Sequence, residues 1–320
     1  MTTNGPGLSQ FAVVMPVYED QEAASRLMKN LRQEYGDAVT VVAVDDGSVR
    51  HPIDAGTLDA AGIKGVVIKL RRNVGHQRAI AIGLNYVADQ MPDCPCTIVM
   101  DSDGEDTPGS IRELVVPLQS PDVDVVVAER KSRVETWRFK TFYVVYKALF
   151  QLLSGRKISF GNFMALKPFA IKRVAAMQEL WMHIAACVLT SKLRLITTPI
   201  DRGPRYAGKS KMNFVGLALH GFRALMVFAE DVLVRVGIAC SFVAALTVFG
   251  SVVAVGLKLA GVATPGWFSV ALGILLLMFL QTGAVTLMTL MLTGVVRSGS
   301  PNQIDYRGYI DQVLHAGQRG

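Results

Sequence analysis

The chain has 320 residues, of which 51% are hydrophobic and 18% are charged, and its mean hydropathy is +0.34. This composition is more apolar than that of a typical soluble enzyme, so it argues against a wholly soluble protein. The formal net charge of +7 is compatible with a nucleic-acid partner. Anionic lipid headgroups are a simpler partner for so apolar a chain, and we expect no nucleic acid.

Residues 11–130 show a pattern of alternating strands and helices. Short apolar runs predict the strands, and apolar residues at helical spacing predict the helices between them. The expected strands are 11–15, 39–44, 65–70, 97–100 and 123–128, with helices at 21–35 and 75–88. Helices at 136–153 and 168–177 and a strand near 193–200 are expected to follow. The alternation predicts an α/β fold with a mainly parallel, Rossmann-like sheet covered on both faces.

Polar residues follow the end of each expected strand, which indicates a binding edge rather than a packing face. The densest group is acidic: Asp101, Asp103, Glu105 and Asp106 come directly after the strand at 97–100. Carboxylates placed together are costly unless a cation cancels their charge. A divalent metal that carries a phosphorylated ligand is a common solution at a strand end. The alternative is a solvated acidic turn after an edge strand.

The first strand is not followed by G-x-G-x-x-G, so the dinucleotide-binding fingerprint is absent. We also expect no P-loop nucleotidase. Acids at two strand ends offer another way to hold a nucleotide. Asp45 and Asp46 are suited to accept hydrogen bonds from a base or ribose, and Asp101 and Asp103 are suited to hold a metal on a diphosphate. A sugar nucleotide satisfies both halves of such a site.

Two long uncharged runs lie in the C-terminal third of the chain. Residues 236–257 would form a helix roughly 33 Å long, enough to span a bilayer, and the run at 267–296 is longer. A buried core helix is the alternative for one such run and is less convincing for two runs joined by a short link. Residues 211–234 are amphipathic and predict a helix in the membrane interface, with packing against the soluble domain as the alternative.

Basic residues flank the expected hairpin and predict its orientation. Arg223 and Arg235 precede the first run, Arg297 and Arg307 follow the second, and the link has Lys258 at its edge. We therefore expect a multi-pass protein of the inner (cytoplasmic) membrane with both termini inside and no signal peptide at the polar N-terminus. The expected parts are a cytoplasmic catalytic domain at 1–210, an interfacial helix at 211–234, a transmembrane hairpin at 235–297 and a cytoplasmic tail at 298–320.

Several short motifs occur in a familiar order. They are Pro16-Val-Tyr18-Glu19, Val44-Asp45-Asp46-Gly47-Ser48, Arg72-Asn73-Val74-Gly75, Asp101-Ser-Asp103, Ala128-Glu-Arg130, Gly161-Asn162-Phe163 and Arg205-Tyr-Ala-Gly208-Lys-Ser210-Lys211. Followed by a two-helix hairpin, they resemble the GT-A domain of family 2 glycosyltransferases. Within that family the chain is similar to the polyprenyl-phosphate glycosyltransferases, which include dolichyl-phosphate mannose synthase and the bactoprenol glucosyltransferases. The resemblance covers residues 11–297.

The resemblance implies an inverting, metal-dependent enzyme that moves one sugar from a nucleotide sugar, a UDP-sugar favoured, to a polyprenyl phosphate. The nucleotide sugar would be bound by Pro16, Tyr18, Glu19, Asp45, Asp46, Asn73 and Asp101. Mg²⁺ or Mn²⁺ would be held by Asp101, Asp103 and Glu105. The acceptor phosphate and the leaving diphosphate would be gathered by Arg130, Arg205, Ser210 and Lys211. The expected catalytic residues are Asp103, Arg130, Arg205 and Lys211.

Two positions depart from the family pattern. Glu105 stands where Gln is common, which adds a negative charge near the metal, and Asn162 stands where Asp is common. An amide cannot act as a general base, but a polyprenyl phosphate is already an anion at neutral pH and needs positioning rather than deprotonation. His76 is a further candidate for a nucleotide contact, with a surface histidine at a helix start as the alternative.

Other functions stay open at this point. A processive polysaccharide synthase would need a Q-x-x-R-W motif and more membrane spans, and Gln178-Glu-Leu-Trp181 lacks the arginine. The intact acids and cations argue against a non-catalytic membrane scaffold. Transfer to a different lipid acceptor is not excluded by the motifs. A homo-oligomer formed through the membrane helices is compatible with the sequence.

Overall fold

The computed structural model describes residues 10–130, 148–157, 159–207, 214–262, 266–298 and 304–317. The chain divides into two compact units. Unit 1 comprises Met1–Glu135, Ile158–Val227 and Asn302–Gly320, and unit 2 comprises Thr136–Lys157 and Phe228–Pro301. Most of the helix expected at 136–153 lies outside the described residues.

A mixed sheet forms the centre of unit 1. Its described strands are β1 Phe11–Val17, β2 Val39–Asp45, β3 Lys64–Leu70, β4 Thr97–Val99, β5 Val125–Arg130, β6 Phe160–Leu166, β7 Leu195–Ile200 and β8 Ile310–His315. They follow the order β7-β5-β6-β4-β1-β2-β3-β8. The central strands from β4 to β3 are parallel, while β6 and β8 run antiparallel to their neighbours. The predicted α/β class with a mainly parallel sheet is confirmed.

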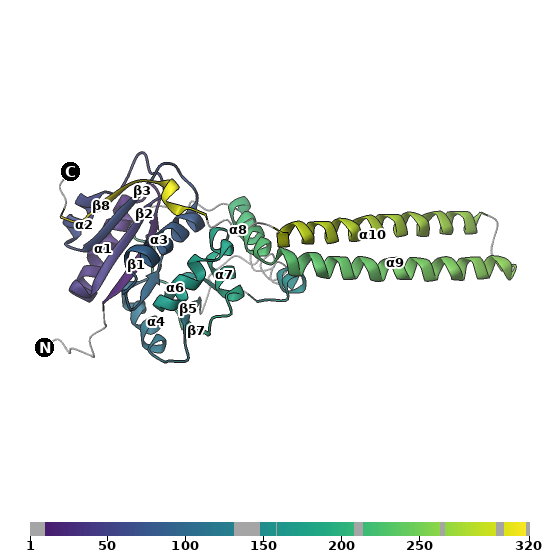
Figure 1. Ribbon diagram of the computed structural model, residues 1–320, viewed down its shortest axis with the longest axis horizontal. Coiled ribbons are helices and arrows are strands. Elements are labelled where there is room, and N and C mark those ends of the chain that lie inside the picture. Colours follow the sequence, from purple (N-terminus) through teal and green to yellow (C-terminus); the bar gives the residue numbers. More distant parts are fainter. Residues whose placement is uncertain are drawn as a thin grey trace. The chain divides into compact units, whose positions relative to one another are not determined.

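Helices cover both faces of this sheet (Figure 1). They are α1 Gln21–Tyr35, α2 Ala55–Ala61, α3 His76–Gln90, α4 Ile111–Leu118, α6 Pro168–Ala175 and α7 Ile184–Thr190. A further helix of unit 1, α8 Phe214–Val227, contacts α7. Successive strand residues point to opposite faces, so one strand supplies two cores. Val14 of β1 packs in the core that contains Ile80 of α3, and Val13 packs in the core that contains Leu27 of α1.

The C-terminal residues return to the sheet. β8 pairs antiparallel with β3, and its yellow arrow lies beside β3 in Figure 1. Tyr306 Oη donates to Asp89 Oδ2 at 3.0 Å, and Arg307 Nη2 lies 3.1 Å from the same oxygen. The sequence indicated only a tail at 298–320. A short edge strand was missed because its backbone pairing needs no continuous apolar run of its own.

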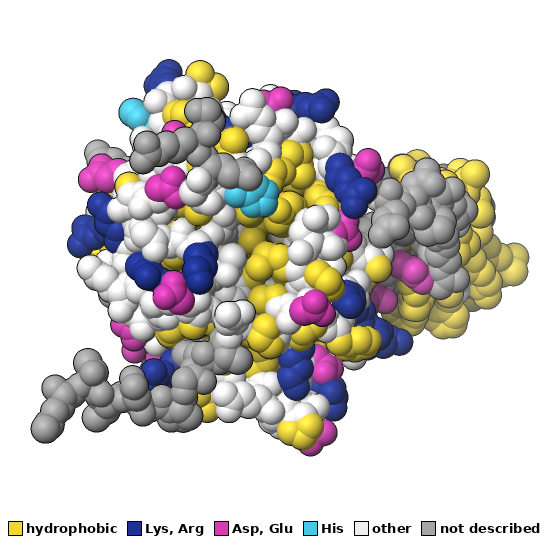
Figure 2. Space-filling model, turned by 60° about the vertical axis from the view of Figure 1, so that its left-hand side comes forward, with side chains coloured by type: hydrophobic (Ala, Val, Ile, Leu, Met, Phe, Trp, Pro, Cys, Tyr) yellow, Lys and Arg dark blue, Asp and Glu magenta, His cyan; other side chains and the backbone are white. Residues whose placement is uncertain are grey.

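The two long helices of unit 2 are α9 Ala229–Leu259 and α10 Trp267–Ser298. Both are long and apolar enough to cross a membrane, by length and composition. Their large apolar side chains are mostly exposed, and Figure 2 shows hydrophobic atoms, in yellow, over their surface. This exposure argues against buried core helices, because soluble proteins rarely leave apolar patches of this size open to water. The predicted uncharged runs at 236–257 and 267–296 fall within these helices.

The amphipathic stretch predicted at 211–234 includes α8, which ends at Val227, and the first residues of α9. On α8, Phe222 is 63% exposed and Met226 is also exposed, while Ala224 is buried. One side of the helix therefore packs on protein and the other presents apolar side chains, as an interfacial helix does.

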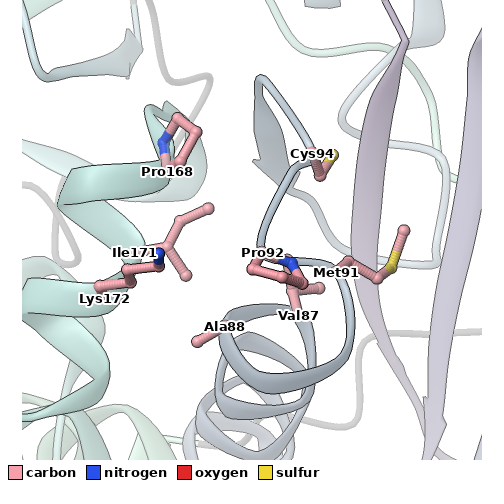
Figure 3. A pocket seen from close by; sticks show the side chains of 8 residues that line it. All are labelled: Val87, Ala88, Met91, Pro92, Cys94, Pro168, Ile171 and Lys172. Carbon is pink, nitrogen blue, oxygen red and sulfur yellow. The ribbon is translucent and has the colours of Figure 1, made fainter.

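A small hollow between the end of α3 and the start of α6 lies away from the carboxyl ends of the parallel strands (Figure 3). It is lined by Val87, Ala88, Met91, Pro92, Cys94, Pro168, Ile171 and Lys172. Its volume is about 10 Å³, which is room for about one water molecule. Since α3 runs from the carboxyl edge of the sheet back to the amino edge, this hollow is not part of the site predicted from the strand ends.

Candidate active site

The carboxyl ends of β1, β2 and β4 bring the predicted site together at one edge of the sheet. Asp46 N donates to Val17 O at 2.8 Å, which ties the end of β2 to the end of β1. Met100 N donates to Val14 O at 3.1 Å, which ties the end of β4 to the other side of β1. The acids that follow β2 and the acids that follow β4 therefore flank the same strand, as a ligand site at the edge of an open α/β sheet requires.

Asp45 and Asp46 hold the loops around them. Asp45 accepts the backbone N–H groups of Ser48 and Ile53 at 2.9 and 3.1 Å. Asp46 accepts those of Val74 and Gly75 at 2.7 and 3.0 Å. Burial raises the pKa of Asp46 despite these bonds. Each carboxylate oxygen can accept a second hydrogen bond, so loop ordering and the predicted contact with a nucleoside are compatible roles.

The turn after Asp46 requires glycine. Gly47 has φ +70°, and a Cβ there would lie 2.6 Å from the backbone nitrogen of Asn73. The close approach of the two loops places Asn73 at the edge of the predicted nucleotide site. Its side chain is exposed.

Glu19 is bound by a run of backbone N–H groups. Its carboxylate accepts from Val49 at 2.7 Å, from Arg50 at 3.1 Å and from His51 at 2.9 Å. These hydrogen bonds lower the pKa of Glu19 from 4.5 to about 2. The neighbouring Tyr18 is 43% exposed at the end of β1. Glu19 thus orders the loop after Asp46, and the partly exposed Tyr18 precedes it in the chain.

The acidic turn consists of Asp101, Asp103, Glu105 and Asp106. Two arginines that follow β7 neutralise part of its charge. Arg205 Nη2 lies 2.6 Å from Asp103 Oδ2, and Arg202 Nη1 lies 2.5 Å from Glu105 Oε2. Longer contacts join Arg202 Nε to Asp106 Oδ1 at 3.5 Å and Arg205 Nε to Glu105 Oε1 at 3.6 Å. Four carboxylates and two guanidinium groups leave a net negative charge in the turn.

Crowding of these carboxylates shifts their proton affinities in opposite directions. Burial raises the pKa of Asp101, but the charges of His76 and Arg202 and the nearby Asn162 together outweigh burial and lower it to about 2. Burial and the charge of Asp101 raise the pKa of Asp106 to about 7. Burial also raises the pKa of Asp103. Such splitting is expected where like charges share a site.

Asp101 and Asp103 fit a divalent cation by their chemistry. Asp101 Oδ1 is buried and accepts no hydrogen bond within the described residues, although His76 Nε2 lies 3.2 Å away. Among those residues, no group of three acidic, histidine or cysteine side chains converges on one point. Mg²⁺ is commonly held by one or two carboxylates together with phosphate oxygens and water, so two acids suffice when a diphosphate is the other ligand.

A row of polar side chains extends from the acidic turn to α7. Asn162 Nδ2 lies 2.9 Å from His76 Nε2, and Gln77 Nε2 donates to Asn162 Oδ1 at 3.0 Å. The buried Gln77 also accepts the backbone N–H of Ile184 at 2.8 Å. Burial lowers the pKa of His76, but the nearby Asp101 carboxylate raises it above its ordinary value. His76 and Asn162, both uncertain from the sequence, therefore lie at the site.

The structure leaves some of the predicted residues undescribed and adds others. Ser210, Lys211 and the side chain of Arg130 lie outside the described part of the chain. Pro16 lies within β1, next to the end of the strand. Sequence reasoning missed Arg202 and Gln77. Arg202 was detectable as a second cation in the same short run as Arg205, whereas nothing local in the sequence distinguishes Gln77.

Residues 203–210 satisfy the consensus G-x-x-x-x-G-K-[ST], so the P-loop pattern is present in the sequence although no P-loop was expected. In a P-loop, free backbone N–H groups of this run cradle phosphates. Here Gly203 N donates to Glu105 O and Tyr206 N donates to Asp103 O, both at 2.9 Å. These N–H groups are already used, so the described half of the run does not form a phosphate cradle.

Comparison with known proteins assigns the class. Residues 12–181 match glycosyl transferase family 2, and this is more than half of the chain, so the chain belongs to that family. Its fold is similar to that of glucosyl-3-phosphoglycerate synthase from Mycobacterium tuberculosis, crystallised with Mn²⁺ and UDP-glucose. The TM-score is 0.50 at 13% identity, covering 70% of this chain and 79% of that one. The protein is therefore a glycosyltransferase with a GT-A domain.

Two relatives by sequence are more specific. The chain is 28% identical over 251 residues to an undecaprenyl-phosphate 4-deoxy-4-formamido-L-arabinose transferase from Edwardsiella ictaluri, covering 76% of this chain and 72% of the relative. It is also 23% identical over 284 residues to an uncharacterized glycosyltransferase, YkoT, from Bacillus subtilis. That match covers 84% of this chain and 82% of the relative.

Proposed function

We propose that this protein transfers one sugar from a nucleotide-sugar donor, a UDP-sugar favoured, to a polyprenyl phosphate at the cytoplasmic face of the membrane. The observation that carries this proposal is the acidic turn at the sheet edge, faced by Arg202 and Arg205, in a chain that also carries two exposed apolar helices. The product would be a polyprenyl-phospho-sugar, the donor for a later glycan or lipid modification. The undecaprenyl-phosphate transferase among the relatives supports a polyprenyl acceptor.

The donor half of the site would extend from β2 to β4. Asp45, Asp46 and Tyr18 are suited to a base and ribose, because they combine acceptor oxygens at the end of β2 with an exposed aromatic ring at the end of the neighbouring β1. Asp101 and Asp103 would hold Mg²⁺ or Mn²⁺. When bound, the metal would neutralise charge on the leaving diphosphate. The solved Mn²⁺ and UDP-glucose complex of the M. tuberculosis enzyme supports this choice of donor and metal.

The acceptor half would depend on cations. Arg205 lies at the acidic turn, and Arg130, Ser210 and Lys211 would add further donors for the phosphate of the lipid. Guanidinium groups form paired, charge-assisted hydrogen bonds with phosphate oxygens. A phosphate monoester is anionic at neutral pH, so it attacks without loss of a proton. The amide of Asn162, which cannot act as a base, is compatible with that reaction, and in-line attack would invert the anomeric carbon.

The hairpin would place this chemistry at the membrane surface. Chain connectivity supports placing both ends of the hairpin on the same side of the membrane. The reason is that α8 before the hairpin and β8 after it both belong to unit 1. The excess of arginine on the same flanks favours the cytoplasmic side. The exposed apolar face of α8 is suited to the interface, where the phosphate of a polyprenyl lipid would also lie.

A transfer assay tests the proposal directly. Purified full-length protein in detergent would be incubated with undecaprenyl phosphate, Mg²⁺ or Mn²⁺, and a panel of labelled UDP- and GDP-sugars. We expect label in the organic phase with one donor and none after EDTA. Nucleotide-sugar binding without a lipid product would favour a different lipid acceptor. Absence of binding by any donor would support a non-catalytic scaffold.

A further inference from the structure

The segment Asp201–Ala207, here called the strap, is attached to the acidic turn by its backbone. Gly203 N donates to Glu105 O, and Tyr206 N donates to Asp103 O, each at 2.9 Å. These two bonds hold the strap in one register along the turn. The register decides which side chains of the strap meet which acids.

Tyr206 fits between the acidic turn and α1. Gly104, with φ +83°, lies against the ring so closely that a Cβ there would overlap it. The guanidinium carbon of Arg26 lies 4.7 Å from the ring centroid, and Asn30 Nδ2 donates to Tyr206 Oη at 2.9 Å. Arg26 and Asn30 both belong to α1. The ring is thus fixed by the turn on one side and by a rigid helix on the other.

Arg205 is the immediate neighbour of this fixed ring. Its Nη2 lies 2.6 Å from Asp103 Oδ2, one of the oxygens through which Asp103 would bind the metal. A long arginine side chain loses considerable rotamer freedom in such a pair. Fixing the backbone on both sides of Arg205 reduces this entropy cost, because fewer positions are then accessible to the guanidinium group before it pairs with Asp103.

We propose that Tyr206 is a positioning residue for sugar transfer, which holds Arg205 against Asp103 so that the arginine serves as the counter-ion of this acid before the metal and donor bind. This inference rests on the proposed function. It has two opposite consequences. Loss of Tyr206 leaves Arg205 badly placed for phosphate, so turnover falls. The same loss frees Asp103 from a competing cation, so the protein without donor binds Mn²⁺ more tightly.

The test uses full-length protein in detergent and two readouts, the kcat of lipid glycosylation and Mn²⁺ binding by electron paramagnetic resonance without donor or lipid. Tyr206→Ala should lower kcat by at least about tenfold, since small misplacements of a catalytic group have effects of up to about 100-fold. It should tighten Mn²⁺ binding by about threefold, as loss of a partly exposed ion pair allows. A purely structural role would weaken both.

The matched control is Tyr35→Phe. Tyr35 belongs to α1, the helix that carries Arg26 and Asn30. Its hydroxyl donates to Pro108 O at 2.7 Å, close to the acidic turn but away from the strap. This variant should lose a comparable hydrogen bond while kcat and Mn²⁺ affinity stay within about twofold of wild type. Equal effects of Tyr35→Phe and Tyr206→Ala would overturn the proposal, as would wild-type kcat and Mn²⁺ affinity in Tyr206→Ala.

Milder variants keep the proposal testable if Tyr206→Ala does not fold. Tyr206→Phe retains the ring on Gly104 and removes only the hydrogen bond to Asn30. Asn30→Ala removes the same hydrogen bond by deleting the other partner. Each should shift both readouts in the same two directions, and the double variant should be no worse than either single one. Additive effects, or no shift in either single variant, would contradict the proposal. Tighter Mn²⁺ binding in a protein that glycosylates no lipid would support the positioning role and reject the acceptor.

Discussion

At the scale of single residues, the distribution of charge decides what the acidic turn can do. Asp103 is 9% exposed, and its carboxylate is shared between Arg205 and the backbone N–H of Glu105. Asp101 has a buried oxygen without a hydrogen bond among the described residues. A cation bound between Asp101 and Asp103 would neutralise both carboxylates. No side chain in the described part of the site bridges these two acids.

Asp103→Ala should abolish lipid glycosylation, because it removes one of the three predicted metal ligands. We expect a loss of about 100-fold or more in kcat, the size seen when an electrostatic group is removed from an active site. The measurement is initial rate under saturating donor and Mn²⁺. Glu113→Ala, which removes an exposed carboxylate on α4, is the control and should retain wild-type rate. Near-normal turnover in Asp103→Ala would reject the metal assignment.

Asn162→Asp tests whether a general base is required. Aspartate keeps an acceptor for Gln77 Nε2 but loses the amide group that faces His76 Nε2. Since the phosphate acceptor needs no deprotonation, kcat should stay within about an order of magnitude of wild type. The measurement is kcat with undecaprenyl phosphate across neutral pH. A large gain in rate would show that a base at this position does matter.

At the scale of elements, acids at strand ends organise loops as well as bind ligands. The carboxylates of Asp45, Asp46 and Glu19 accept hydrogen bonds from seven backbone N–H groups in the loops that follow β2 and β3. The loops are therefore in place before any nucleotide arrives. This preorganisation reduces the entropy that donor binding would otherwise cost.

The Glu19 carboxylate should stabilise the fold in a pH-dependent way. Its pKa in the folded protein is about 2, below the ordinary 4.5, so its contribution is complete above about pH 4.5 and is lost as the pH falls toward 2. Glu19→Gln should lower the thermal midpoint by a constant amount near neutral pH. The difference from wild type should shrink below about pH 4. The exposed Glu22→Gln is the control, and a pH-independent difference for Glu19→Gln would contradict the role of its charge.

At the scale of the whole molecule, the chain leaves unit 1 twice, at residues 136 and 228, and returns to it each time. α8 precedes the hairpin, and β8 follows it and completes the edge of the sheet beside β3. An even number of spans is the arrangement that lets one folded unit contain both flanks without crossing the bilayer. The C-terminal strand thus belongs to the catalytic unit rather than to a free tail.

This connectivity predicts the labelling of single cysteines in intact cells. Ala260→Cys, at the exposed end of α9, should react with a membrane-impermeant thiol reagent added outside, and Gln312→Cys on β8 should not. The native Cys96 is buried, and burial raises the pKa of its thiol to about 12, so it should remain unmodified as an internal control. Labelling of both new cysteines, or of neither, from outside would contradict the predicted hairpin topology.

The sequence by itself determined the features that depend on local pattern. Strand and helix alternation in residues 11–130 and the two uncharged runs follow from periodicity and hydropathy, because burial by a sheet or a bilayer selects residues along a continuous stretch. The positions of Asp45, Asp46, Asp101 and Asp103 at strand ends followed from the same pattern. Family membership was readable from these motifs and their order.

Only the tertiary structure decided which distant groups meet. Arg202 pairs with Glu105 across 97 positions of sequence, and Asn30 bonds Tyr206 across 176. No local periodicity encodes such pairs, since each depends on the register of separate elements in one sheet. The antiparallel insertion of β6 and the edge pairing of β8 were hidden for the same reason. The strap lies over the acidic turn because the fold brings the carboxyl ends of β7 and β4 to a common edge of the sheet. There the arginines that follow β7 pair with the acids that follow β4.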